Sequence, residues 1–332
     1  MDTLLEVRDL RVQFNTPRGV VTAVDGITFR INRGETLCVV GESGCGKSAT
    51  ALSILRLLAD NGIYAGGEIR FRGRDLRTLS IQEMRRMRGS EISMIFQEPM
   101  TSLNPVHQVG RQIGESFIIH AKDSRAAAWA KAVQILEHVG VPDAERVAKC
   151  YPHQLSGGMR QRVMIAMAMA CSPDLLIADE PTTALDVTIQ AQILRIIKTL
   201  QQEKGLAVLF ITHDLGVVAE IADYIVVMYA GKIVEEGRPE EIFYHPKHPY
   251  TEGLLRCIPR VDTDKDRLDI IRGNVPNPEN FPGGCRFHDR CDYCREQCAT
   301  QTPALRKGGE GQYACHFTPE ERHAERSREH DG

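Results

Sequence analysis

Residues 36–48 read TLCVVGESGCGKS, the most informative run in the chain. Thr36–Val40 is short and apolar and predicts a buried strand, whereas Ala49–Leu58 predicts a helix. The loop Gly41–Ser48 between them fits the pattern G-x-x-x-x-G-K-[ST], in the strand–loop–helix context that this pattern requires. A chance match in a chain of this length has odds of about one per cent. The run therefore predicts a phosphate-binding P-loop.

Each residue type in this loop has a chemical reason to be there. Glycines let backbone N–H groups close around phosphate oxygens, and the start of the following helix adds a favourable field. Lys47 can reach the β and γ phosphates, and the Ser48 hydroxyl can bind Mg²⁺. The residues expected to hold the nucleotide here are Gly41, Ser43, Gly44, Cys45, Gly46, Lys47, Ser48 and Ala49.

A second motif, LLIADE at Leu175–Glu180, is an apolar strand that ends in two carboxylates. Asp179 at the strand tip is placed to hold Mg²⁺ through water, and Glu180 is placed to orient or deprotonate an attacking water. Many strands end in acidic residues, so this pair alone is a weak signal. Downstream of a P-loop it predicts nucleotide hydrolysis.

The surrounding pattern predicts an α/β fold. Residues 10–14 and 27–31 alternate like two strands, and the turn signal between them predicts a β hairpin. Residues 175–178 and 208–212 are apolar and bounded, as in buried parallel strands, and residues 187–202 have helical spacing. This strand–helix–strand order indicates a core with a parallel sheet.

Composition narrows the class of protein. The 332 residues are long for one domain and carry a formal charge of −3, which does not favour a nucleic-acid binder that works by bulk electrostatics. Hydrophobic residues make up 42%, but no apolar run approaches the ~18 residues of a membrane span. The N-terminus lacks the pattern of a signal peptide. We therefore expect a protein that stays in the cytoplasm and reaches a membrane by docking onto another subunit.

Residues 155–162 read LSGGMRQR. The pattern indicates an anion-binding helix start, against the simpler interpretation of a serine N-cap followed by flexible glycines. It resembles the signature of the ABC (ATP-binding cassette) family, L-S-G-G-Q, with Met159 in place of the usual Gln. In that family the signature contacts the γ-phosphate of ATP held by a partner subunit. The resemblance assigns this contact to Ser156, Gly157 and Gly158.

Further positions match the family in order and spacing. Gln97 resembles the Q-loop glutamine, which contacts Mg²⁺ and water, and Ala184–Asp186 resembles the D-loop. His213 resembles the switch histidine that contacts the γ-phosphate. Phe14 resembles the aromatic residue that stacks on adenine, although its alternation with Leu10 and Val12 fits a core residue nearly as well.

Three segments narrow the resemblance to the ATPase subunits of bacterial dipeptide and oligopeptide importers: QEPMTSLNP at Gln97–Pro105, YPHQ at Tyr151–Gln154 and HPYT at His248–Thr251. The resemblance implies hydrolysis of Mg–ATP coupled to two transmembrane permease subunits, at the cytoplasmic face of the membrane. It also implies a second, related ATPase as partner, a heterodimer being favoured over a homodimer. An extracytoplasmic substrate-binding protein is an indirect partner, and nucleic acid is not one.

Two other classes of protein share some of these motifs. A soluble ABC ATPase that acts on nucleic acid or ribosomes, with a zinc-binding cysteine module, usually has two cassettes or a long insertion, whereas this chain has no internal repeat. A scaffold with a degenerate nucleotide site conflicts with the intact Lys47, Glu180 and His213. The transport ATPase is therefore the leading prediction.

Cysteines cluster near the C-terminus. In a cytosolic protein such a cluster favours metal binding over disulfides, and Cys291 and Cys294 fit the close spacing of zinc ligands. The importer resemblance instead implies an iron–sulfur cluster, through the pattern G-C-x5-C-x6-C and a later C-H. It assigns a four-iron, four-sulfur cluster, with zinc as the alternative, to Cys285, Cys291, Cys298 and Cys315. The third interpretation is a small apolar knot of reduced cysteines.

The predicted architecture is thus an ABC cassette of the P-loop NTPase class. It comprises a RecA-like core, an antiparallel β subdomain, a helical subdomain and a small, irregular, metal-binding extension. We expect the nucleotide-binding domain at residues 1–255, with the helical subdomain at about 97–157 and a helix at 124–139. The cysteine-containing extension follows at 256–318. The charged residues 319–332 predict a disordered tail.

Overall fold

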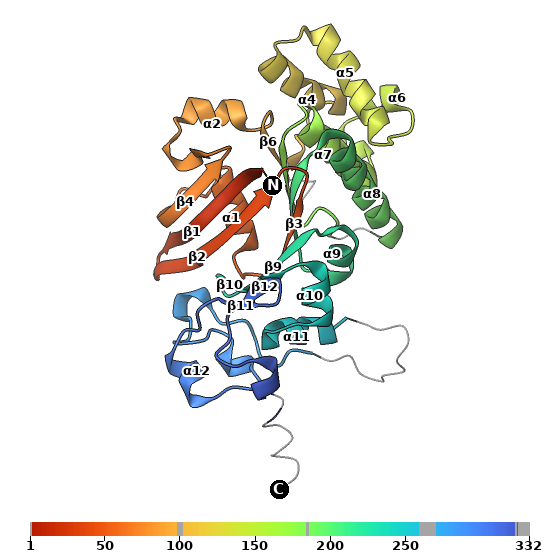
Figure 1. Ribbon diagram of the computed structural model, residues 1–332. Helices are drawn as coiled ribbons and strands as arrows, with labels where there is room; N and C mark the ends of the chain where they lie inside the picture. Colours follow the sequence, from red (N-terminus) through yellow and green to blue (C-terminus); the bar gives the residue numbers. More distant parts are fainter. Residues whose placement is uncertain (1, 98–101, 184–185, 259–269, 323, 325–332) are drawn as a thin grey trace.

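The computed structural model describes residues 2–97, 102–183, 186–258, 270–322 and 324. The described residues form two sheets with helices around them (Figure 1). Helices α4 (Val109–Ser116), α5 (Arg125–His138) and α6 (Ala144–Ala148) lie at one end of the molecule. Residues 270–322, here called the C-terminal segment, lie at the opposite end (Figure 1).

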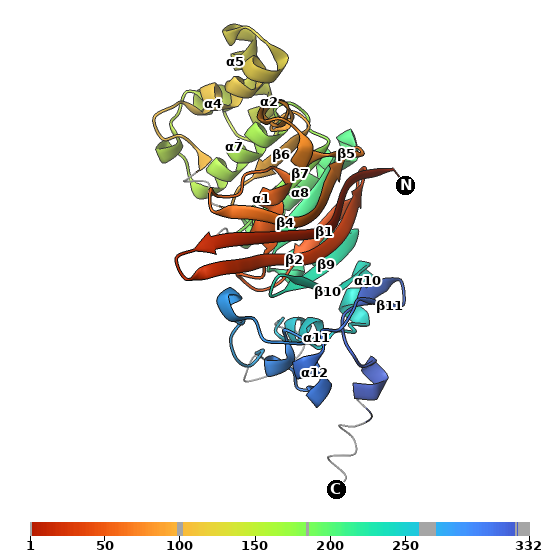
Figure 2. The same cartoon turned by 90° about the vertical axis from the view of Figure 1, so that its left-hand side faces the viewer.

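The first sheet is antiparallel. Among the described residues its strand order is β2-β1-β4-β5, and Figure 2 shows it in front of the second sheet. Its strands are β1 (Thr3–Thr16), β2 (Gly19–Asn32), β4 (Gly62–Phe71) and β5 (Arg74–Asp75). Thr16 pairs with Gly19 across a tight turn, so the predicted β hairpin is present, with longer strands than the alternation indicated. The side chains of Leu10, Val12 and Ile27, on strands of this sheet, are buried in one hydrophobic core.

The second sheet is mixed and contains the P-loop strand. In the described part of the chain its order is β11-β12-β10-β9-β3-β8-β7-β6. Neighbouring strands from β9 to β6 are parallel, and the pairs from β11 to β9 are antiparallel. The strands are β3 (Thr36–Val40), β6 (Ile92–Ile95), β7 (Leu175–Asp179), β8 (Ala207–Thr212), β9 (Tyr224–Tyr229), β10 (Lys232–Gly237), β11 (Arg306–Gly308) and β12 (Gly311–Tyr313).

The α-helices are α1 (Lys47–Ile54), α2 (Ile81–Met87), α4 (Val109–Ser116), α5 (Arg125–His138), α6 (Ala144–Ala148), α7 (Gly157–Met169), α8 (Val187–Lys204), α9 (Leu215–Ile221), α10 (Pro239–Tyr244), α11 (Pro249–Arg256) and α12 (Glu296–Thr300). Helix α5 begins where predicted, because the Ser124 hydroxyl accepts the N–H of Ala127 as an N-cap. None of the helices in the described part of the chain combines the length and hydropathy that a membrane span needs.

Helix α1 differs from its prediction. It begins at Lys47 rather than Ala49, and it ends at Ile54 rather than Leu58. Arg56 stops it by adopting a left-handed backbone with φ of 51°. The Arg56 guanidinium then donates to the backbone carbonyls of Leu76 and Leu79. These tertiary hydrogen bonds, which sequence periodicity does not report, outweigh the helical preference of the apolar residues that follow.

The C-terminal segment is joined to the core of the molecule through the second sheet. Strand β12 pairs with β10, Glu235 lying opposite Tyr313, and β11 then pairs with β12. Residues 319–322 form a helical turn in which Arg322 is buried, and Arg322 donates to Glu252 of α11. The rest of the expected tail, apart from residue 324, lies outside the described residues.

Candidate nucleotide site

The P-loop lies between β3 and α1 and depends on glycine at two positions. Gly41 and Gly46 have φ of 154° and 101°. A Cβ at Gly41 would lie 2.2 Å from the Met228 carbonyl oxygen, and one at Gly46 would lie 2.4 Å from the Ala23 carbonyl oxygen. Gly46 caps α1 without a side chain, so the first N–H groups of the helix have no side-chain cap. This is the arrangement of a phosphate-binding helix start.

Lys47 is 5% exposed and is held against the loop. Its Nζ donates to the carbonyl oxygens of Gly41 at 2.7 Å and Glu42 at 3.0 Å. The neighbouring Ser48 hydroxyl donates to Asp179 Oδ1 at 3.2 Å. Burial raises the pKa of the Asp179 carboxyl, and the hydrogen bond from Ser48 opposes this shift. The structure thus brings together the lysine, hydroxyl and carboxylate of the two predicted motifs.

Glu180 is the centre of the predicted catalytic group. Gln97 Nε2 donates to Glu180 Oε2 at 3.1 Å, and the Thr183 hydroxyl donates to the same oxygen at 2.9 Å. His213 Nδ1 lies 3.4 Å from Glu180 Oε1. These residues converge because β7 and β8 are parallel neighbours, which places Asp179 opposite Ile211 and brings both strand ends to one edge of the sheet. Thr183 was not predicted from the sequence.

The signature residues are exposed at the start of α7. Ser156 accepts the N–H of Met159 at 3.4 Å as the N-cap, and both Ser156 and Gly157 are exposed. A Cβ at Gly157 would meet nothing within 4 Å, whereas one at Gly158 would lie 2.9 Å from the Ile189 side chain. Gly158 therefore permits close packing of α7 on α8, while Gly157 faces open space.

Two other predicted residues have evident local roles. Asp186 is exposed and caps α8 by accepting the N–H of Ile189 at 2.9 Å; the other D-loop residues, 184 and 185, lie outside the described residues. Phe14 is half-buried and packs on the core of the antiparallel sheet. A Cβ at Gly62 would lie 3.1 Å from the Phe14 ring, so this ring packs closely on the neighbouring strand.

The four cysteines assigned to a cluster line one small cavity of about 20 Å³: Cys285, Cys291, Cys298 and Cys315. Burial raises the pKa of Cys285 to about 11 and of Cys291 to about 12. Cys294 is exposed and is not among the residues that line this cavity. Within the described ranges, however, no three or more His, Cys, Asp or Glu side chains are arranged to hold a metal ion. The predicted metal-binding extension is therefore not supported as a formed site; the cysteines gather at one cavity.

Three residues beside the P-loop were missed by motif reasoning. Tyr250 lies in the HPYT segment, and its hydroxyl accepts the N–H of Glu42 at 2.9 Å. His248 caps α11 by accepting the N–H of Tyr250 at Nδ1, and burial lowers the pKa of His248 to about 3. Arg290, from the cysteine segment, contacts the Glu42 carboxylate. The HPYT segment resembles a subfamily marker, and no local sequence pattern relates it to Glu42, the residue that Tyr250 contacts.

Known proteins resemble this chain over most of its length. A family model for ABC transporters matches residues 24–183, and one for the oligopeptide/dipeptide transporter C-terminal region matches residues 234–298. Oligopeptide transport ATP-binding protein AppD of Bacillus subtilis (strain 168) is 50% identical over 98% of this chain and 100% of its own length. Oligopeptide transport ATP-binding protein OppD of Escherichia coli (strain K12) is 49% identical over 96% of this chain and 94% of its own length.

A solved structure shares the fold. The dimeric structure of MJ0796, a bacterial ABC transporter cassette, aligns with a TM-score of 0.64 and 26% identity. The alignment covers 71% of this chain and 98% of that chain. Together with the two identities near 50% over nearly the whole chain, these matches show that the chain belongs to the ABC transporter family, among the ATP-binding proteins of oligopeptide and dipeptide transport.

Proposed function

We propose that this chain is the ATP-hydrolysing subunit of an ABC importer for peptides. The observation that carries the proposal is the convergence of Gln97, Thr183 and His213 on Glu180, next to the P-loop hydroxyl and the Asp179 carboxylate. Relatives at about half identity are named as oligopeptide transport proteins, which does not favour the alternative of a soluble ATPase that acts on nucleic acid or ribosomes.

In the proposed reaction, different residues bind the phosphates, hold Mg²⁺ and activate the water. Lys47 and the N–H groups of the P-loop bind the β and γ phosphates, and Ser48, Asp179 and Gln97 are the oxygen donors placed to hold Mg²⁺ directly or through water. When bound, the metal neutralises charge on the phosphates. Glu180 orients the water and accepts its proton, while His213, 3.4 Å from Glu180, contacts the γ-phosphate from the adjacent strand end.

The signature serves a second subunit in this proposal. Exposed Ser156 and Gly157 face the nucleotide of a partner ATPase, while Gly158 allows α7 to pack closely on α8. The dimeric structure of MJ0796 is a precedent for two cassettes in one assembly. We favour a related but different ATPase as the partner.

Gly157→Asp tests this arrangement. The new side chain has room in its own chain, since a Cβ at this position meets nothing within 4 Å. It would instead bring a negative charge to the partner's γ-phosphate. We expect ATP hydrolysis by the assembled transporter to fall by roughly 10²-fold, the scale of losing one donor to developing negative charge. ATP binding to the isolated variant should not change. Full ATPase activity of the parent chain, in a preparation that light scattering shows to be monomeric, would show that the signature does not act on the nucleotide of a partner subunit.

The permease contact is proposed for residues 94–115, which begin in the last two residues of β6 and include Gln97. A shift in this segment can move a residue that hydrogen-bonds Glu180, which would couple transport to hydrolysis. The chain would thus sit at the cytoplasmic face of the membrane, bound to two permease subunits, and would serve a substrate-binding protein on the other side. Residues 98–101 lie outside the described part of the chain. We propose that the nucleotide-binding domain ends near residue 255 and that the cysteine-containing extension ends near residue 318.

We also propose that Cys285, Cys291, Cys298 and Cys315 hold a four-iron, four-sulfur cluster, with zinc as the alternative. Support comes from their shared cavity and from the all-thiolate donor set, which suits either group. Anaerobically purified protein should be brown and contain about four iron and four sulfide per chain. Replacing any of the four by Ser should lower the iron content, whereas Cys294→Ser, at the exposed cysteine, should retain it. Stoichiometric zinc without sulfide would contradict the cluster.

A further inference from the structure

The loop between Cys285 and Cys291 reaches the P-loop through Arg290. Arg290 Nη1 lies 2.6 Å from Glu42 Oε2, and Nη2 lies 3.1 Å from Glu42 Oε1, so the pair is bidentate. Glu42 is the second residue of the P-loop, immediately after Gly41. The C-terminal segment, although distant in sequence, is therefore bound directly to the phosphate-binding loop by this ion pair.

The backbone groups of Glu42 take part in the hydrogen bonds that hold the P-loop. Its carbonyl oxygen accepts from Lys47 Nζ at 3.0 Å, and its N–H donates to the Tyr250 hydroxyl at 2.9 Å. Its carboxylate is held by Arg290. Fixing the side chain of Glu42 consequently fixes the peptide groups that hold the phosphate-binding lysine.

Arg290 is itself rigidly held. Its side chain is 5% exposed. Nε donates to the Arg272 carbonyl at 2.9 Å, and the terminal nitrogens also donate to the Tyr229 hydroxyl and the Ile271 carbonyl. The bidentate pair has a defined geometry, and because the Arg290 side chain is buried, removing the Glu42 carboxylate leaves the charge of Arg290 uncompensated.

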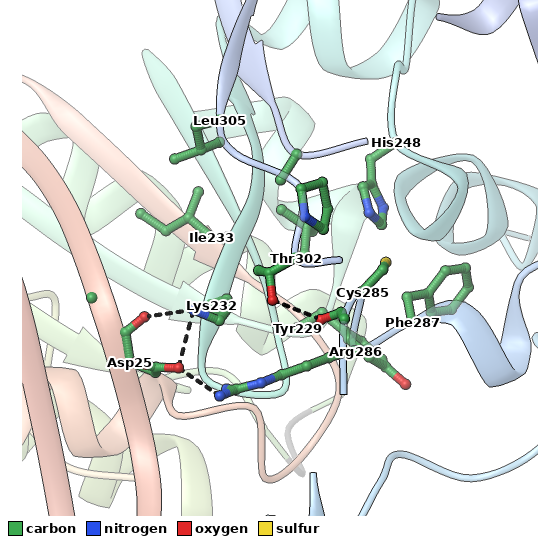
Figure 3. Close-up of a pocket in the computed structure, with 15 residues that line it drawn as sticks. Asp25, Tyr229, Lys232, Ile233, His248, Cys285, Arg286, Phe287, Thr302 and Leu305 are labelled. Atoms are coloured by element: carbon green, nitrogen blue, oxygen red, sulfur yellow. Dashed lines mark hydrogen bonds and ion pairs between the residues drawn. The ribbon is translucent and has the colours of Figure 1, made fainter. Parts of the chain in front are cut away.

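A second arginine of the same loop, Arg286, is linked to the P-loop at Cys45. Arg286 donates to Asp25 Oδ2 at 2.5 Å, and Lys232 also pairs with Asp25 (Figure 3). Arg286 donates as well to the carbonyl of Ala230, and the residue after Ala230, Gly231, donates its N–H to the Cys45 carbonyl at 3.0 Å. Phe287, between the two arginines in sequence, packs edge-on against Tyr229 with ring centroids 5.2 Å apart.

We propose that Arg290 is a positioning residue for ATP: through Glu42 it holds the first half of the P-loop, and thereby Lys47, in the conformation that binds phosphate. The cysteine segment then acts on nucleotide affinity and not only on stability. This inference rests on the nucleotide site proposed above. It does not depend on which group, if any, occupies the cysteine cavity.

The test is a double-mutant cycle on the full chain, with the affinity for Mg–ATP measured by calorimetry. All variants carry Glu180→Gln to prevent turnover. Arg290→Ala and Glu42→Gln should each raise the Kd about tenfold, the effect of one charge-assisted hydrogen bond. The double variant should bind Mg–ATP about as tightly as the weaker-binding of the two single variants, because both changes break the same interaction. Arg290→Lys should recover only part of the affinity, since a lysine cannot form the bidentate pair.

Controls separate positioning from folding. Arg256→Ala removes a half-exposed arginine of the same region, whose guanidinium lies 3.8 Å from Asp292, and should leave the Kd unchanged. Thermal melting identifies the temperature range in which each variant is folded. Glu42→Gln tests the pair with Arg290 and its packing left intact, so the cycle remains informative even where Arg290→Ala folds poorly.

The outcomes are distinct. A lowered melting temperature with the Kd within about twofold of the parent, or additive effects of the two changes, would overturn the inference. If Lys47→Ala also left the Kd unchanged, the nucleotide site itself would be wrong. If Lys47→Ala weakened binding and Arg290→Ala and Glu42→Gln did not, only the role of Arg290 would fail.

Discussion

Glu180→Gln should lower the rate of ATP hydrolysis at this subunit's site by roughly 10²–10⁴-fold, the contribution typical of general-base catalysis. Glutamine preserves the shape of the side chain and can still contact Gln97, Thr183 and His213, which surround the carboxylate. It cannot accept the proton of the attacking water. Binding of Mg–ATP should persist, because Lys47 and Ser48 are unchanged.

The measurement is single-site turnover in the assembled transporter, alongside ATP binding. The chain offers a matched control in Glu203, an exposed carboxylate 3.5 Å from His138, which resembles the Glu180–His213 pair at 3.4 Å. Glu203→Gln should hydrolyse ATP at the parental rate. If the two variants behave alike, Glu180 is not the catalytic base.

Lys47→Ala should instead act on binding. Its Nζ is the positive charge held by the carbonyls of Gly41 and Glu42 in the P-loop, and the side chain is buried there. Loss of a charged donor to phosphate costs about 1.5–3 kcal/mol, equivalent to a rise of about tenfold to a hundredfold in the Kd for Mg–ATP.

Calorimetry in a Glu180→Gln background measures this change directly. Lys204→Ala, which removes an exposed lysine whose Nζ donates to the Ser172 hydroxyl, should bind ATP as the parent does. Unchanged affinity in Lys47→Ala would show that the loop does not bind phosphate in the manner proposed.

That the motif residues lie close together could be predicted because each belongs to a short motif at the end of a strand. The P-loop, the end of β7 and His213 are each fixed by a strand end, and neighbouring parallel strands bring them together. Helix α5 could be predicted for a similar reason, because its cap, Ser124, is the residue next to its start.

The role of the C-terminal segment could not be predicted in this way. Strand β11 reads RKG and β12 reads GQY, too short and too polar to show an alternating pattern. The Arg290–Glu42 pair joins residues 248 positions apart, with no motif that relates them. The cysteine spacing suggested a separate metal-binding module, whereas the described structure shows a segment that completes the core sheet and contacts the P-loop.

We propose that this chain powers peptide import by hydrolysing ATP at Glu180. The most direct test is uptake of a labelled peptide by cells of the native host in which the gene is deleted and then restored as the parent, Glu180→Gln or Glu203→Gln, with equal amounts of each protein in the membrane. We predict that the parent and Glu203→Gln restore uptake, while Glu180→Gln leaves it at the level of the deletion. Uptake restored in full by Glu180→Gln would show that ATP hydrolysis at Glu180 does not power peptide import.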